Sequence, residues 1–122
     1  MINAFVALDE AKLENGCLWV LKGSHKLGRI DHGKVGAQAG VEQKRMDTLI
    51  ERMELVPVMM KPGSVLLFHG NTLHSSSANE SDRHRRSFIM CYNAVSNPQI
   101  KPDGVVEVRP TCPVGDDRLI LG

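Results

Sequence analysis

Three of the five histidines lie in one stretch, Phe68 to Ser87, together with three arginines and several serines. A neutral imidazole can bind a metal ion, and a guanidinium can grip a carboxylate through two parallel hydrogen bonds. A serine hydroxyl can add a further bond to the same carboxylate. His74, Ser76 and Arg85 would therefore suit a diacid that chelates a metal at one end and reaches a guanidinium at the other. The alternative is a hairpin whose polar groups are merely solvated.

One pairing of this stretch would bring these groups together. If residues 72–76 and 83–87 form a hairpin, His74 falls directly across from Arg85, with Cβ atoms roughly 5 Å apart. The serine two residues after His74 then shares its face, because side chains alternate along a strand. Arg86 would point the other way. A slip of one residue exchanges Arg85 for Arg86, and the sequence leaves both registers open.

The composition describes one soluble globular domain. The chain has 122 residues, 42% of them hydrophobic, and a formal net charge of +1, which argues against a binder of polyanions. No run of eighteen apolar residues and no signal peptide occurs. Cys17, Cys91 and Cys112 form no CxxC motif, which favours reduced thiols, at least two of them in the core. We expect a cytoplasmic protein with a small-molecule substrate and neither nucleic-acid nor membrane partners.

Short apolar runs punctuated by glycine and proline dominate the chain. The expected strands cover residues 2–8, 17–21, 55–60, 65–68 and 85–95, and the expected helix covers residues 41–53. Many short strands with one short helix predict a mainly all-β fold, an antiparallel sandwich or barrel of the cupin and jelly-roll kind.

Turn residues add detail to this scheme. Asn15-Gly16 favours a turn that joins antiparallel strands, and Pro57 indicates an edge strand. Lys61-Pro62-Gly63-Ser64 predicts a type II turn. Residues 26–40 hold four glycines and are expected to form a loop, and residues 97–122 hold four prolines and are expected to form a tail.

Several short motifs occur in the order of a known family. They are Asn15-Gly16-Cys17-Leu18, Gly23-Ser24-His25-Lys26, Pro62-Gly63-Ser64, Phe68-His69-Gly70, His74-x-Ser76, Asn79 and Arg85. In this order the chain, from about Phe5 to Val95, resembles the phytanoyl-CoA dioxygenase family. The resemblance implies an iron(II)- and 2-oxoglutarate-dependent oxygenase on a double-stranded β-helix. Residues 1–96 would be the C-terminal part of such a domain, followed by the tail 97–122.

The resemblance also implies roles for single residues. His74 matches the distal iron-binding histidine, and Arg85 matches the arginine that salt-bridges the far carboxylate of 2-oxoglutarate. Ser76 matches a hydroxyl that helps to hold that carboxylate, and Phe5 matches an aromatic residue that lines the cosubstrate pocket. His25 is a hallmark of the family without being an iron ligand, and we expect a turn histidine bonded to backbone.

The family's remaining iron ligands come as His-x-Asp or His-x-Glu, and neither motif occurs in these residues. The iron site of a facial triad would thus have one of its three protein ligands here. We expect an incomplete β-helix that is not competent by itself and exposes an apolar face or an unpaired sheet edge. A second copy or a missing N-terminal segment would compensate.

Two other functions stay open at this point. One is a catalytically inactive β-helix that serves as a binding or interaction module. The other is a cupin-like metalloprotein that uses His69, His74 and His84.

Overall fold

The computed structural model describes residues 1–28, 30, 33–35, 38–94, 96–97, 99–100, 104 and 106–107. The chain divides into two compact units, Met1–Tyr92 and Asn93–Gly122. In the second unit, β9 (Gln99–Ile100) and β10 (Val106–Glu107) pair antiparallel. The rest of the expected tail, with Cys112, lies outside the described residues.

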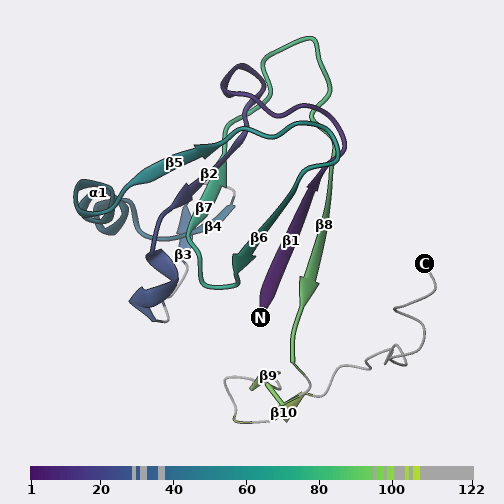
Figure 1. The fold of residues 1–122 in the computed structure, drawn as a ribbon. Helices are drawn as coiled ribbons and strands as arrows, with labels where there is room; N and C mark the ends of the chain where they lie inside the picture. Colours follow the sequence, from purple (N-terminus) through teal and green to yellow (C-terminus); the bar gives the residue numbers. More distant parts are fainter. Residues whose placement is uncertain are drawn as a thin grey trace, which may run out of the picture. The chain divides into compact units, whose positions relative to one another are not determined.

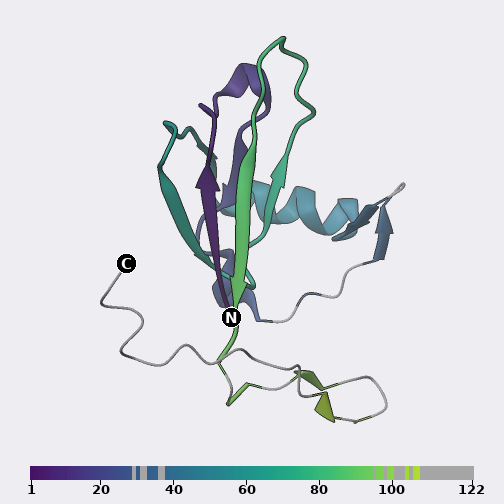
Figure 2. The same ribbon diagram turned by 90° about the vertical axis from the view of Figure 1, so that its right-hand side faces the viewer.

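The first unit contains two three-stranded antiparallel sheets that face each other (Figure 1 and Figure 2). The first sheet has the order β6 (Val65–His69), β1 (Ile2–Ala7), β8 (Ser87–Tyr92). The second sheet has the order β5 (Leu55–Val58), β2 (Leu18–Leu21), β7 (His74–Ser76). The chain passes repeatedly from one sheet to the other, as in a double-stranded β-helix, so the predicted fold class is confirmed.

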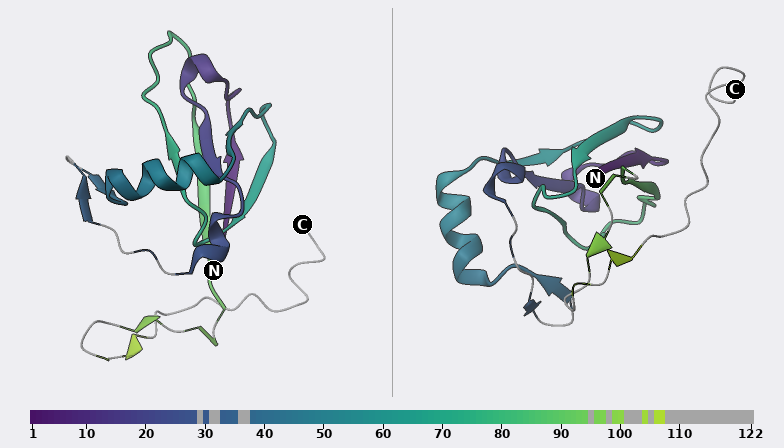
Figure 3. Two further views of the ribbon diagram at one scale, coloured as in Figure 1. Left: turned by 90° about the vertical axis from the view of Figure 1, so that its left-hand side faces the viewer. Right: turned by 90° about the horizontal axis from the view of Figure 1, so that it is seen from below.

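Shorter elements connect these strands. They are the 3-10 helices η1 (Leu13–Asn15) and η2 (Ser24–Leu27), the strands β3 (Gly33–Val35) and β4 (Gln38–Gly40), and the helix α1 (Gln43–Arg52) (Figure 3). The helix confirms the prediction for residues 41–53. The expectation of a loop at residues 26–40 was wrong in part, because β3 and β4 pair antiparallel there.

The two local predictions around β5 are confirmed. Pro57 lies on β5, which is an edge strand, where its missing N–H costs no ladder hydrogen bond. In the following turn the Ser64 amide donates to the Lys61 carbonyl at 3.0 Å, and Gly63 has a φ of +82°. This is the positive φ that a type II turn requires at its third residue.

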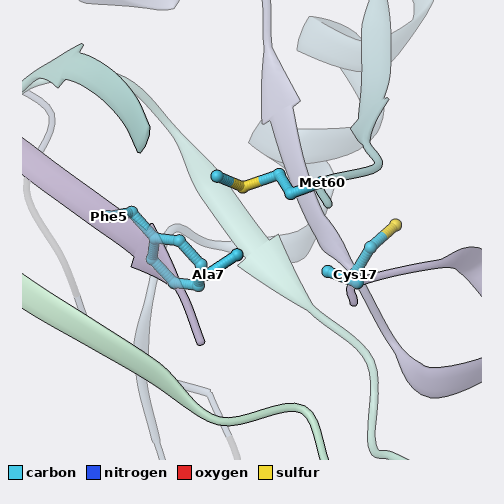
Figure 4. Packing of buried hydrophobic residues seen from close by; sticks show 5 residues of the cluster. Phe5, Ala7, Cys17 and Met60 are labelled. Atoms are coloured by element: carbon cyan, nitrogen blue, oxygen red, sulfur yellow. The ribbon is translucent and has the colours of Figure 1, made fainter. Parts of the chain in front are cut away.

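The hydrophobic core lies between the two sheets. Its buried members are Phe5, Ala7, Ala11, Cys17 and Met60, against which Val58, Leu66 and Phe68 pack (Figure 4). Since alternate residues of a strand face opposite sides, Asn3 shares the inner face of β1 with Phe5 and Ala7. The outer face of the same sheet is apolar and exposed at Val65, Leu67, Phe88 and Tyr92, from 54% to 62%.

The hairpin expected between residues 72–76 and 83–87 was wrong. β7 pairs with β2, which places His74 across from Val20, and β8 pairs with β1, which places Ser87 across from Ala7. The connection between β7 and β8 crosses from one sheet to the other, so these neighbours in sequence never form a ladder.

The turn expected at Asn15-Gly16 also fails to join paired strands, because β1 and β2 belong to different sheets. Asn15 instead closes η1: its Oδ1 accepts from the Lys12 amide and its Nδ2 donates to the Glu10 carbonyl, both at 2.7 Å. Gly16 follows with a φ of +76°.

Each of the two sheets has two edge strands. Among the described residues, β7 bonds only to β2 and β8 bonds only to β1, and β5 and β6 likewise pair on one side only. Next to the free edge of β8, the inward-facing Ile89 is 56% exposed and Cys91 is exposed as well. The exposed apolar face and the unpaired edge that the sequence led us to expect are therefore both present. No described helix is long and apolar enough to cross a membrane.

Candidate functional site

His74 projects from β7 into the space between the sheets. It shares its face of the second sheet with Val58, which packs on the core, and its ring meets Phe68 edge-on at a centroid distance of 5.0 Å. Its Nδ1 lies 2.9 Å from the Thr72 carbonyl oxygen. Because a carbonyl only accepts, this contact is a hydrogen bond when Nδ1 carries the proton, and in the neutral ring Nε2 then has a lone pair for a metal ion. Metal-binding histidines are commonly oriented by such a bond at the other ring nitrogen.

Ser76 lies two residues further along β7 and faces the same side as His74. It is exposed and lies across from Leu18 rather than from a residue of the expected hairpin. Phe5, the other expected lining residue, is 6% exposed and packs in the core from the opposite sheet.

Arg85 reaches the same space from the first sheet. It lies two residues before Ser87, the first residue of β8, and Ser87 is across from the inward-facing Ala7. Its Nη2 donates to the Ser77 carbonyl at 3.4 Å, and its buried Nε has no hydrogen-bond partner in the described part of the chain. An unpaired buried guanidinium nitrogen is costly, and a carboxylate is the ligand that suits it.

The charge of Arg85 also acts on Cys17. Burial raises the pKa of the Cys17 thiol, and the positive charge of Arg85 opposes that rise. Cys17 is fully buried in the core between the sheets. The guanidinium therefore acts electrostatically on the interior.

A β-bulge fixes the residue next to Arg85. The amides of Leu8 and Asp9 both donate to the Arg86 carbonyl, at 3.0 and 3.2 Å, so two residues face one. The Asp9 carboxylate accepts from the backbone amide, Nε and Nη2 of Arg86 at 2.8, 2.8 and 2.9 Å. Arg86 is thereby held outward, and alternation turns Arg85 inward. The prediction that these two arginines point to opposite sides is confirmed, although the hairpin on which it was based does not exist.

The Asp9–Arg86 contact predicts an acid-dependent loss of stability. Hydrogen bonds from Arg86 lower the pKa of Asp9 from 3.8 to about 2. Since the folded pKa lies below the unfolded one, this stabilisation is present above pH 3.8 and is lost as the pH falls through 2. We expect Asp9→Asn to lower the urea midpoint at pH 7 and to flatten its decline between about pH 4 and pH 2. Glu10→Gln is the control, because Glu10 pairs only with the exposed Lys12. Equal flattening in both variants would contradict the assignment.

The histidines that the structure describes do not form a cluster of metal ligands. His25 and His69 contact each other, with ring centroids 5.9 Å apart, and His84 lines a surface pocket with Glu10 and Asp82. The backbone hydrogen bond expected for His25 stays a prediction, and what the structure shows is its ring contact with His69. The described residues contain no group of three or more His, Cys, Asp or Glu side chains placed to hold a metal ion. This argues against a cupin-like centre of His69, His74 and His84.

The described side chains therefore fit the carboxylate of 2-oxoglutarate, and they do not by themselves fit an iron ion. A carboxylate matches the unpaired Nε of Arg85. A metal ion would find His74 as its single ligand among the described residues, and one imidazole does not make a closed or facial site.

Comparisons with known proteins show the family of this chain. The family model "Phytanoyl-CoA dioxygenase (PhyH)" matches residues 1–87. Phytanoyl-CoA dioxygenase domain-containing protein 1 of Bos taurus is 29% identical over 116 residues, covering 93% of this chain and 40% of that protein. The ectoine dioxygenase of Sphingopyxis alaskensis is 34% identical over 120 residues, covering 89% of this chain and 39% of that protein.

Two solved structures have a similar fold. EctD from S. alaskensis, with 2-oxoglutarate and 5-hydroxyectoine, has a TM-score of 0.69 and 32% identity, and the match covers 89% of this chain and 36% of that one. The epimerase SnoN, in complex with Fe3+, alpha ketoglutarate and nogalamycin RO, has a TM-score of 0.57 and 26% identity, covering 96% of this chain and 48% of that one.

The fold defines a jelly-roll domain of the oxygenase type. The chain belongs to the phytanoyl-CoA dioxygenase family. It spans about 40% of the length of the curated relatives that it matches.

Sequence reasoning missed three residues that shape this site. Asp9 anchors Arg86, Gly16 lies under the carbonyl groups of Ser77 and Ala78, and Asn3 is buried on the inner face of β1. No local signal marks Asp9, because its partner Arg86 is far away in the sequence. None marks Asn3 either, because its burial depends on strands from other parts of the chain. Gly16 was noticed, but for a turn that it does not form.

Proposed function

We propose that this chain is the C-terminal part of an Fe(II)- and 2-oxoglutarate-dependent dioxygenase that hydroxylates a small organic substrate. The observation that carries the proposal is the approach of His74 and Arg85 to one interior from facing sides. Nδ1 of His74 lies at the Thr72 carbonyl, which leaves Nε2 for a metal, and Nε of Arg85 has no hydrogen-bond partner among the described residues. The named relatives, among them a methylphosphonate hydroxylase and an ectoine dioxygenase, support the reaction class.

In this proposal each residue has one task. His74 binds iron through Nε2, Arg85 and Ser76 hold the distal carboxylate of 2-oxoglutarate, and Phe5 supplies an apolar wall that excludes water. Iron with 2-oxoglutarate supplies the oxidising chemistry, and the protein supplies position and a closed pocket. The remaining metal ligands come from outside the described residues.

We further propose that a segment with a His-x-Asp pair completes the site along the free edges of β7 and β8. Both edges border the inner face that carries His74 and Arg85, and both expose unpaired backbone groups. A strand added to each would cover Ile89 and Cys91, which lie exposed beside the edge of β8.

The test compares succinate formation from 2-oxoglutarate by this chain and by a chain extended upstream with a His-x-Asp segment, both with Fe(II). We expect none from the chain alone and turnover from the extended chain. His74→Ala in the extended chain should abolish turnover, and His69→Ala, the control, should retain it. Turnover that survives His74→Ala would contradict the proposal.

A non-catalytic binding module is the second candidate. The observation in its favour is the single metal-capable histidine at the site, with no group of three ligands among the described residues. Binding of 2-oxoglutarate without any turnover in the extended chain would support this alternative.

A further inference from the structure

Asn3 is a buried polar residue to which the proposed function gives no task. Its side chain is 7% exposed, and its Oδ1 accepts no hydrogen bond from any residue in the described part of the chain. Buried side-chain oxygens nearly always have a partner, so an exception calls for an explanation. Asn15 shows the ordinary case in the same molecule: it is 4% exposed and is bonded through both Oδ1 and Nδ2.

The position of Asn3 points to the site. Alternation along β1 places Asn3 on the inner face with Phe5, and the register places it across from Phe68 on β6. The Phe68 ring in turn contacts His74, at a centroid distance of 5.0 Å. Directly opposed residues have Cβ atoms roughly 5 Å apart. Asn3 therefore lies near His74, at one end of the space between the two sheets.

The other end of β1 leads to Arg85. Ser87, two residues after Arg85, is across from Ala7, and Ala7 is four positions from Asn3, or about 13 Å at roughly 3.3 Å per residue. A carboxylate held by Arg85 thus lies far from Asn3. At neutral pH 2-oxoglutarate also carries acceptor oxygens only, so it has no proton to donate to Oδ1.

We propose that Asn3 contacts the substrate, and that the substrate carries a hydroxyl or ammonium group that donates to Oδ1 beside His74. This inference rests on the proposed function, because it assigns the cosubstrate to Arg85 and the molecule to be oxidised to the His74 end. Asn3 would then select substrates that have a donor close to the oxidised carbon.

Stability is the first test. In Asn3→Leu an unpaired polar atom is exchanged for an apolar group of similar size, so the urea midpoint should stay unchanged or rise. Asn15→Leu is the matched control, because it breaks two existing bonds, and its midpoint should fall. A fall in Asn3→Leu equal to that in Asn15→Leu would mean that Asn3 is structural, and would overturn the inference.

Ligand selectivity is the second test. Propan-2-ol and acetone share one carbon skeleton, and only the alcohol donates a hydrogen bond. In titrations of the chain followed by NMR, propan-2-ol should shift the backbone amides of Asn3 and Phe68 more than acetone does. Asn3→Leu should abolish that difference. Equal shifts, or no shift with propan-2-ol, would overturn the inference.

A titration of the same sample with 2-oxoglutarate tests the proposed function separately from the role of Asn3. It should shift the amides around Arg85. If it fails to do so while the alcohol still acts at Asn3, the assignment of Arg85 is wrong and the donor-binding role of Asn3 stands as a property of this pocket.

Discussion

Replacing Arg85 by alanine is expected to weaken 2-oxoglutarate binding about 10- to 150-fold, whereas Arg86→Ala should change it less than about threefold. A hydrogen bond to a charged group contributes about 1.5–3 kcal/mol, and each 1.4 kcal/mol corresponds to a factor of about ten. Arg85 has a buried Nε without a described partner, so a carboxylate gains that bond in full. Arg86 already donates three bonds to Asp9 and faces outward.

The measurement is the dissociation constant for 2-oxoglutarate, by calorimetry, in the chain extended upstream with a His-x-Asp segment. Arg85→Lys is an informative intermediate, since it keeps the charge and loses the planar pair of donors. Its affinity should fall between those of the wild type and Arg85→Ala. Equal losses in Arg85→Ala and Arg86→Ala would show that the cosubstrate does not bind where we place it.

Replacing Gly16 by alanine is expected to lower the free energy of unfolding by about 2–5 kcal/mol. Gly16 has a φ of +76°, and a Cβ there would come within 2.5 Å of the Ser77 carbonyl oxygen and 2.7 Å of that of Ala78. Both neighbours are backbone atoms, so the strain cannot be relieved by a rotamer change. The Ser77 oxygen also accepts from Arg85, which means that the shift reaches the carboxylate site.

Gly63 provides the control for this substitution. Its φ is +82°, but no atom lies within 4 Å of an added Cβ. Gly63→Ala should therefore lower the free energy of unfolding only by the cost of a left-handed backbone, about 1–2 kcal/mol. Urea unfolding measures both variants. If they lose equal stability, the close approach at Gly16 is not what makes a glycine necessary there.

The errors of the sequence analysis share one cause. Hydrophobic periodicity and turn residues report on backbone conformation within a few residues. They located most strands of the two main sheets, α1 and the type II turn, and they missed β3 and β4. Pairing depends on which strands meet after the chain has crossed between sheets. His74 lies on β7 of the second sheet, whereas Arg85 leads into β8 of the first sheet, so the pairing assumed for them failed.

The sequence alone predicted a mainly β-stranded member of the phytanoyl-CoA dioxygenase family. It also named His74 and Arg85 as candidate ligand-binding residues and placed Arg85 and Arg86 on opposite sides of the chain. These predictions rest on residue types, motif order and local periodicity, which are properties of the sequence and do not depend on how the strands pair. Only the tertiary structure decided that His74 and Arg85 approach from facing sheets, that Asp9 holds Arg86, and that Asn3 is buried without a partner. Such contacts join residues up to 77 positions apart, and they arise when the two sheets close over a common core.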